Sequence, residues 1–215
     1  MARVKVKICG ITNWTDARRA VDEGADFLGF NFYEGSPRCI RPAKAKQIVR
    51  RLPKGVLAIG IFVNEPEEKM LETARKVGLD ALQLHGDETP ATVARLKKSF
   101  PVIKAIRVKN LLRASELNRF KKAHALLLDG FDSHQRGGTG KTFDWKMARK
   151  AGKYGRIFLA GGLTPGNVGE AIRTARPYAV DVCSGVEARP GKKDPARMRS
   201  LMRAVKEAQR QEKAR

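Results

Sequence analysis

The chain has 215 residues, 42% of them hydrophobic, so it is long enough to bury a substantial core within one domain. Its 44 lysines and arginines against 22 acidic residues give a formal net charge of +22, which attracts polyanions and small anionic substrates. No apolar run is long enough to cross a bilayer, and the N-terminus leads into the first strand without a signal peptide, so we expect a cytoplasmic protein with no membrane partner.

Short β-branched apolar runs alternate along the chain with amphipathic stretches whose apolar residues lie three and four positions apart. Strands are predicted at Val4–Cys9, Phe27–Phe32, Leu57–Val63, Ala81–His85, Val102–Val108, Ala125–Asp129, Ile157–Gly161 and Ala179–Ser184. Helices are predicted at Thr15–Glu23, Ala43–Leu52, Glu67–Val77, Thr89–Ser99, Leu111–Lys122, Asp144–Lys153, Pro165–Ala175 and Pro195–Arg210. Thr12 or Asn13 is the expected cap of the first helix, and Pro165 the expected start of the seventh.

Eight strand–helix units of this kind predict an α/β protein, a parallel sheet closed into a single-domain (β/α)8 TIM barrel. An open, doubly wound sheet is the alternative. We expect residues 1–205 to form the barrel and residues 206–215 to be a charged extension of the last helix. The longest irregular stretch is Gly130–Thr142, and a loop of that length inside a compact domain is usually functional.

In a barrel of this type the carboxyl ends of the strands form one site. Cys9 and Asp129 would both lie there, and a thiol and a carboxyl group can exchange protons on opposite sides of a small molecule. A buried structural thiol is the alternative for Cys9, and a carboxylate that caps the following turn is the alternative for Asp129.

Two glycine turns follow the last two predicted strands. Gly161 and Gly162 form the first, and Ser184 and Gly185 the second. Glycine allows close backbone approach, and free N–H groups at such turns favour an anion, so they predict a phosphate site. Arg38, on the loop after the second strand, could bind a carboxylate with two hydrogen bonds, although a solvated arginine is common on so basic a chain.

Side-chain alternation along strands places Lys7 on the same face as Cys9, and Asp181 on the same face as Cys183. The first and eighth strands are neighbours in a closed barrel. We therefore expect a buried Lys7–Asp181 pair under the site, with a cation close enough to lower the pKa of Cys9.

The remaining candidates carry weaker signals. His85 ends the fourth strand, and a catalytic histidine is one interpretation of it. Because the sequence fixes no acidic partner, a hydrogen-bonded structural histidine is the favoured interpretation. The three cysteines are far apart in the sequence, which favours reduced thiols, and Cys39 and Cys183 are interpreted as packing residues. No metal-ligand spacing is present, so no metal site is predicted.

Several motifs, in order and at consistent spacing between about residues 3 and 194, resemble those of the phosphoribosylanthranilate isomerase family. They are Lys7-Ile8-Cys9-Gly10-Ile11-Thr12, Phe62-Val63-Asn64, Gln83-Leu84-His85-Gly86, the segment from Gly137 to Trp145, the segment from Ala160 to Val168, and the segment from Asp181 to Glu187.

The resemblance implies a small barrel that catalyses a cofactor-free Amadori rearrangement of N-(5-phosphoribosyl)anthranilate in tryptophan biosynthesis. It implies that Asp129 is the general acid and Cys9 the general base. It also implies that Arg38 faces the anthranilate carboxylate, that Asp181 lies near the sugar hydroxyls, and that the two glycine turns bind phosphate. Cys183 departs from the family pattern, since serine is more usual there, and so does the segment Gly130–Arg136.

Two other functions remain open. A broader sugar isomerase would also act on the related aminoaldose of histidine biosynthesis, but such enzymes pair two aspartates and this chain has Cys9. A basic barrel could also bind nucleic acid. The basic residues are dispersed, however, and aromatics are only 7% of the chain, so we expect no specific nucleic-acid partner. The expected partner is a small anionic phosphosugar–anthranilate substrate, bound by a monomer or homodimer.

Overall fold

The computed structural model of the protein describes residues 3–108, 112–130 and 144–213. Residues 131–143, which make up most of the predicted Gly130–Thr142 loop, lie outside the described residues. The strands of the main sheet are β1 (Lys5–Ile8), β2 (Phe27–Asn31), β3 (Leu57–Phe62), β4 (Ala81–Leu84), β5 (Val102–Val108), β6 (Ala125–Gly130), β7 (Ile157–Ala160) and β8 (Ala179–Val182). The helices are α1 (Trp14–Glu23), α2 (Pro42–Val49), α3 (Glu67–Val77), α4 (Pro90–Leu96), α5 (Ala114–Arg119), α6 (Trp145–Ala151), α7 (Val168–Ala175) and α8 (Pro195–Lys213).

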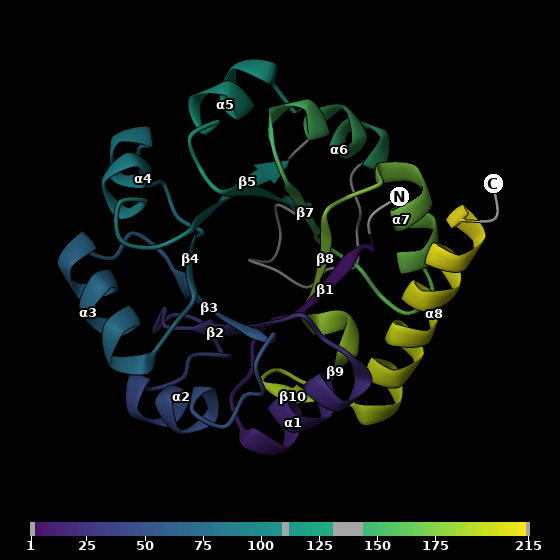
Figure 1. The fold of residues 1–215 in the computed structure, drawn as a ribbon, viewed down its shortest axis with the longest axis horizontal. Coiled ribbons are helices and arrows are strands. Elements are labelled where there is room, and N and C mark those ends of the chain that lie inside the picture. The colour runs from purple at the N-terminus through teal and green to yellow at the C-terminus, as the bar shows by residue number, and fades with distance from the viewer. Residues whose placement is uncertain (1–2, 109–111, 131–143, 214–215) are drawn as a thin grey trace.

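The eight strands form a closed parallel barrel in chain order, with β1 hydrogen-bonded to β8. Figure 1 looks along the axis of this barrel, with the strands in the centre and the helices in a ring outside them. The predicted (β/α)8 TIM barrel is confirmed, and the open sheet is excluded by the pairing of the first strand with the last.

Apolar residues fill the barrel from alternate positions on its strands. Phe27, Ile59, Ile103, Leu127 and Phe158 belong to this inner cluster and are all buried. The residues between them face the helices and form a larger, separate core. Because inward and outward positions alternate, each strand end presents a predictable side chain to the interior.

Side-chain hydrogen bonds set the starts of two helices, one as predicted and one not. Asn13 is the N-cap of α1, as expected, and accepts a hydrogen bond from the Asp16 N–H at 2.9 Å. The predicted start of the seventh helix at Pro165 is wrong. The Asn167 side chain accepts from Thr164 N–H and donates to Gly162 O, which holds residues 164–167 in a turn, so α7 begins at Val168.

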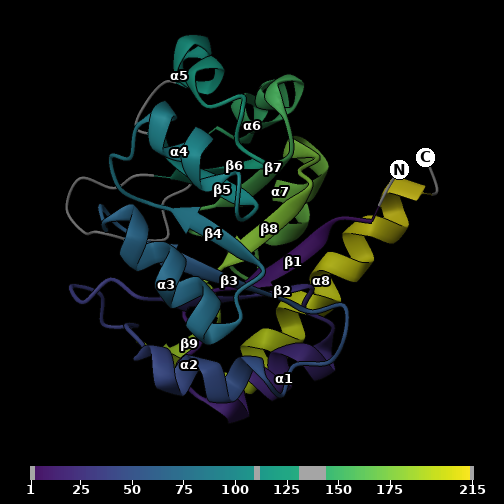
Figure 2. The same ribbon diagram turned by 60° about the vertical axis from the view of Figure 1, so that its left-hand side comes forward.

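The last helix is the longest of the described helices and closes the ring. It contacts both α7 and α1, as Figure 2 shows from a second direction. It runs to Lys213, three residues beyond the predicted end at Arg210. Between β8 and α8 lie a short 3-10 turn (Ser184–Val186) and the antiparallel pair β9 (Glu187–Arg189) and β10 (Lys192–Lys193). These elements bring Glu187 and Lys193 to the end of the barrel where the strands finish.

Candidate active site

The closed barrel gathers the predicted site residues at one end of the molecule. Cys9 directly follows β1, Asp129 is the second-last residue of β6, and Asp181 lies in β8. Arg38 lies on the loop between β2 and α2, and the two glycine turns follow β7 and β8. Since all eight strands are parallel, these positions share the C-terminal rim of the barrel, where barrel enzymes bind their ligands.

A buried ion pair lies beneath the ends of β1 and β8. Lys7 Nζ donates to Asp181 Oδ2 at 2.8 Å, and the Lys7 side chain is 0% exposed. The predicted Lys7–Asp181 pair is therefore confirmed, and the two residues face each other directly in the strand register. Burial alone would lower the pKa of Lys7, but Asp181 and Cys9 raise it, so the lysine stays cationic. Burial raises the pKa of Asp181 to about 7, against the opposing effect of Lys7.

Cys9 lies on the same face, half-buried, with a second thiol beside it. The pKa of Cys9 is held well below its usual value because Cys183 donates a hydrogen bond to it and because Lys7 and Lys193 are nearby, effects that outweigh burial. The pKa of Cys183 is raised by the same hydrogen bond and by burial. A thiolate is the basic and nucleophilic form of cysteine. The site therefore presents a base at the end of β1.

Asp129 contacts the histidine for which the sequence offered no acidic partner. His85 Nε2 lies 3.3 Å from Asp129 Oδ2, and His85 Nδ1 lies 3.0 Å from Gln83 Nε2. The two contacts engage both ring nitrogens, so Gln83 and Asp129 together fix the plane of the imidazole. The hydrogen-bonded histidine expected from the sequence is confirmed. Its contact also orients the carboxyl group at the rim.

Arg38 is held by a carboxylate to which the sequence analysis gave no role. Its Nε donates to Glu187 Oε1 at 3.0 Å and its Nη2 to Glu187 Oε2 at 2.7 Å. Fully buried Lys193 donates to the same Glu187 Oε1 at 2.9 Å. Burial would raise the pKa of Glu187, but Arg38 and Lys193 hold it below its usual range. A two-point pair of this kind fixes the guanidinium plane, so Glu187 sets the direction in which Arg38 presents its remaining N–H groups.

Only a weak signal in the sequence points to these partners. Glu187 is an acidic residue directly after the Ser-Gly-Val turn, and Lys193 is one of many lysines. Two further predictions, for the cysteines, are corrected here. Cys39 is exposed rather than a packing residue, and Cys183 lies half-buried at the rim beside Cys9. All three thiols are free, as expected.

The two glycine turns pack directly against each other. Gly161 and Gly162 have φ angles of +86° and +65°, a conformation that favours glycine. A Cβ atom on Gly185 would lie only 2.0 Å from Leu163 O, so the second turn reaches the first only because residue 185 has no side chain. The N–H groups of Gly162, Ser184 and Gly185 donate to no backbone acceptor among the described residues. Such a concave set of N–H groups is suited to an anion.

Other kinds of site are not found among the described residues. No group of three or more histidine, cysteine, aspartate or glutamate residues there could hold a metal ion. In the same ranges, no helix combines the length and the apolar character needed to span a membrane. A cavity of about 520 Å³ lies between Glu23 and α8, but none of the rim residues lines it. The chemistry-bearing groups thus remain those at the strand ends.

The fold and the rim together define a single-domain (β/α)8-barrel protein with a thiol, a carboxyl group and a glycine-lined anion cradle around one site. Comparison with known proteins identifies the particular family. The chain matches the family described as N-(5'-phosphoribosyl)anthranilate (PRA) isomerase over residues 6–204.

Individual relatives agree. The N-(5'-phosphoribosyl)anthranilate isomerase of Pelobacter propionicus is 50% identical over 204 residues, covering 95% of this chain and 96% of the relative. The crystal structure of phosphoribosyl anthranilate isomerase from Thermotoga maritima superposes with a TM-score of 0.90 at 43% identity, covering 95% of this chain and 99% of that chain. A structure of the isomerase in complex with reduced 1-(o-carboxyphenylamino)-1-deoxyribulose 5-phosphate has a TM-score of 0.85 at 40% identity, covering 95% and 99% of the two chains.

This chain belongs to the N-(5'-phosphoribosyl)anthranilate isomerase family. The resemblance seen in the sequence motifs is confirmed. Its function is that of an isomerase in tryptophan biosynthesis.

Proposed function

We propose that the chain catalyses the Amadori rearrangement of N-(5-phosphoribosyl)anthranilate with Asp129 as general acid and Cys9 as general base. The observation that carries this assignment is the position of Cys9 above the buried Lys7–Asp181 pair, where a thiolate is favoured. Asp129 is on the same rim, so that one group can give a proton to a bound substrate and the other can take a proton from it.

The reaction requires one proton to be given and one to be taken. Asp129 protonates the ribose ring oxygen, the bond from the anomeric carbon to that oxygen breaks, and the anthranilate nitrogen supplies the electron pair that forms an iminium. The Cys9 thiolate then takes the proton from the neighbouring sugar carbon. The electrons of that carbon–hydrogen bond neutralise the iminium and give an enolamine, which tautomerises to 1-(2-carboxyphenylamino)-1-deoxyribulose 5-phosphate. No redox cofactor is needed, because substrate and product are isomers: one sugar carbon is oxidised while its neighbour is reduced within the same molecule.

Binding groups follow from the charges of the substrate. The glycine turns at Gly161-Gly162 and Ser184-Gly185 are assigned to the phosphate, because their packed backbones present N–H groups. Arg38 is assigned to the anthranilate carboxylate. Glu187 occupies its Nε and one Nη2 hydrogen, so the substrate would meet the edge that includes Nη1. Asp181 accepts a hydrogen bond from Lys7 through Oδ2. Its Oδ1 has no hydrogen-bond partner among the described residues, so this oxygen is free to accept from a sugar hydroxyl.

The experiment is rescue of a tryptophan auxotroph lacking this isomerase, followed by steady-state kinetics on purified variants. Cys9→Ala and Asp129→Ala should each lower turnover by at least about two orders of magnitude while the far-ultraviolet circular dichroism stays that of the parent. Cys39→Ala and Asp22→Ala remove an exposed thiol and an exposed carboxylate and serve as matched controls with parental activity.

Failure of the parent chain to rescue would overturn the function, and full activity in either rim variant would overturn the mechanism. Kinetics with the aminoaldose of histidine biosynthesis test the broader isomerase. We expect no turnover of that substrate, because the enzymes that use it pair two aspartates.

The setting of this activity is also proposed. We expect the enzyme in the cytoplasm, acting as a monomer or homodimer on a small anionic substrate, with no specific nucleic-acid partner. Residues 1–205 would form the catalytic barrel, with 206–215 as an extension of α8. One of the similar solved structures comes from a dimeric isomerase of Thermotoga maritima converted to monomers, and size-exclusion chromatography with light scattering would determine the state of this chain.

A further inference from the structure

The two half-buried cysteines of this chain are neighbours across adjacent strands. β1 and β8 pair in parallel with Lys7 opposite Asp181 and Ile8 opposite Val182. The Cys9 N–H donates to Val182 O at 2.9 Å, which carries the ladder one step further. Cys9 and Cys183 therefore follow as the next opposed positions.

Their side chains also share a face. Alternation along each strand places Cys9 with Lys7 and Cys183 with Asp181, and the side chains of Lys7 and Asp181 meet at 2.8 Å. A Cβ atom on Gly10 would lie 3.0 Å from Cys183 Sγ, so that sulfur approaches the backbone just after Cys9, where no side chain is present. Neighbouring strands run about 4.8 Å apart, within the roughly 4.4–6.8 Å between Cα atoms that a disulfide spans.

We propose that Cys9 and Cys183 form a reversible disulfide when the protein meets a peroxide, and that this bond switches the isomerase off. The site of oxidation follows from the thiol pair alone. The loss of activity rests on the proposed role of Cys9 as general base, because a disulfide sulfur cannot accept a proton from carbon.

The surroundings favour reaction at this pair. Lys193 Nζ lies 3.8 Å from Cys183 Sγ, and Lys7 is buried on the same face, so cations are present on both sides of the two sulfurs. Cationic neighbours enrich the thiolate, which is the form that attacks peroxide. The lowered pKa of Cys9 supports this order of events.

The chemistry balances with a peroxide as the oxidant. The Cys9 thiolate attacks one peroxide oxygen and the O–O bond breaks. The other oxygen departs as hydroxide, and Cys9 becomes a sulfenic acid. The Cys183 sulfur then attacks the Cys9 sulfur, the S–S bond forms, and the sulfenic oxygen leaves as water with the proton from Cys183. In total, two thiols and one hydrogen peroxide give one disulfide and two waters. A dithiol reverses the step by exchange.

Cys39 provides an internal comparison. It is exposed on the loop after β2, where its neighbour across an isolated bridge is Asn31, so it has no thiol partner in the described fold. Burial and the nearby Glu34 raise its pKa, which disfavours its thiolate. Cys39→Ser is therefore the matched control.

The experiment treats the purified full-length chain with a limited excess of hydrogen peroxide, followed by peptide mapping under non-reducing conditions and by activity assays before and after dithiothreitol. We expect one linked peptide pair containing Cys9 and Cys183, lighter than the free peptides by two hydrogens. We also expect loss of activity that dithiothreitol restores, both in the parent and in Cys39→Ser.

Cys183→Ser should form no link and should lose activity that dithiothreitol does not restore, because Cys9 alone proceeds to sulfinic acid. Absence of the linked peptides in the oxidised parent overturns the proposal, whatever Cys183→Ser does. Linked peptides with unchanged activity would confirm the disulfide but overturn the switch, together with Cys9 as base.

Discussion

A thiol acts as a base near neutral pH only where its thiolate is favoured, and three side chains around Cys9 supply that preference. Cys183 donates a hydrogen bond, and Lys7 and Lys193 contribute positive charge. Lys7 can do so because Asp181 keeps it charged in a fully buried position. Without that pair, a lysine in the barrel interior would lose its proton to burial.

Lys7→Met tests this tuning through pH. Burial already raises the pKa of Asp181 to about 7, so without Lys7 the carboxyl group takes up a proton. The charge of the pair is then still zero, but Cys9 loses the nearby cation and the hydrogen-bond donor that lower its pKa. The pKa of Cys9 should then rise toward the ordinary thiol value of about 8.5. Because the base must be deprotonated, the ascending limb of kcat/KM should move to higher pH.

The matched control is Lys76→Met, which removes an exposed lysine of α3 from the same +22 background. Its pH profile should coincide with that of the parent. An unmoved ascending limb in Lys7→Met would mean that Cys183 and Lys193 alone set the basicity of Cys9.

At the scale of elements, the active-site rim is built by turns that pack on one another after β7 and β8. Gly185 lies where any side chain would strike Leu163 O, and Asn167 ties the first turn closed. The short pair β9–β10 then returns Glu187 and Lys193 to the rim, where Glu187 fixes Arg38. The proposed phosphate and carboxylate sites therefore depend on the same segment.

Gly185→Ala should separate the two turns, because the added methyl group cannot fit 2.0 Å from a carbonyl oxygen. We expect KM for the phosphorylated substrate to rise by about tenfold or more, the cost of one misplaced charge-assisted hydrogen bond. Gly152→Ala is the control, since a Cβ atom there meets nothing within 4 Å and its φ is not positive. Parental KM in both variants would place the phosphate elsewhere.

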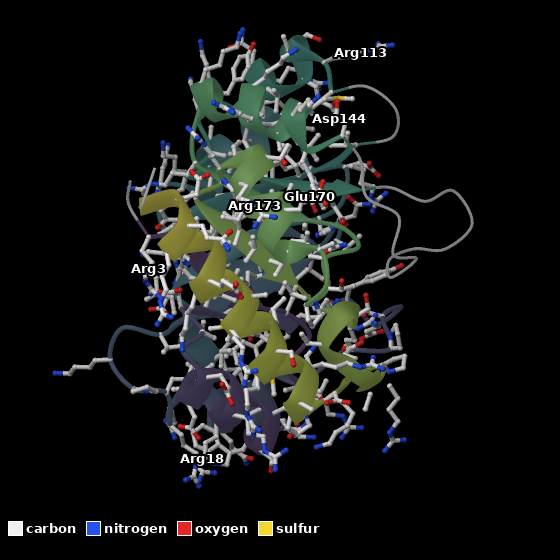
Figure 3. The ribbon with its side chains drawn as sticks, turned by 90° about the vertical axis from the view of Figure 1, so that its right-hand side faces the viewer. Arg3, Arg18, Arg113, Asp144, Glu170 and Arg173 are labelled. Atoms are coloured by element: carbon white, nitrogen blue, oxygen red, sulfur yellow. The ribbon has the colours of Figure 1, made fainter. Side chains whose placement is uncertain are left out.

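Across the whole molecule, the positive charge is spread over the outer surface of the helical ring. Figure 3 shows Arg18 of α1 and Arg113 at the start of α5 projecting from the ring, and Arg3 projecting from the segment before β1; all three are exposed. A field of this sign attracts a substrate that carries a phosphate and a carboxylate. Since such a field is screened over about 8 Å at physiological salt, its effect must depend on ionic strength.

We therefore expect kcat/KM to fall several-fold as potassium chloride rises from low to physiological concentration, while kcat stays constant. Addition of a viscogen establishes whether encounter limits kcat/KM under the same conditions. A viscosity-dependent but salt-independent kcat/KM would exclude steering by the +22 charge.

The amino-acid sequence by itself determined the elements and what stands at the end of each strand. Apolar periodicity is a local property, so it located eight strand–helix units, and alternation then predicted that Lys7 would face Asp181. The count of eight strand–helix units implied a closed barrel, and a closed barrel places Cys9 and Asp129 on one rim.

Only the tertiary structure decided which side chains meet there. Arg38 and Glu187 are 149 residues apart, and His85 and Asp129 are 44 apart. The start of α7 depends on the hydrogen bonds of the Asn167 side chain. The exposure of Cys39 depends on the conformation of the loop after β2. Alternation could predict the Lys7–Asp181 pair because β1 and β8 are neighbours in a closed barrel. The other pairs join connecting segments or strands that are not neighbours, so they depend on where the closed barrel brings those backbones together.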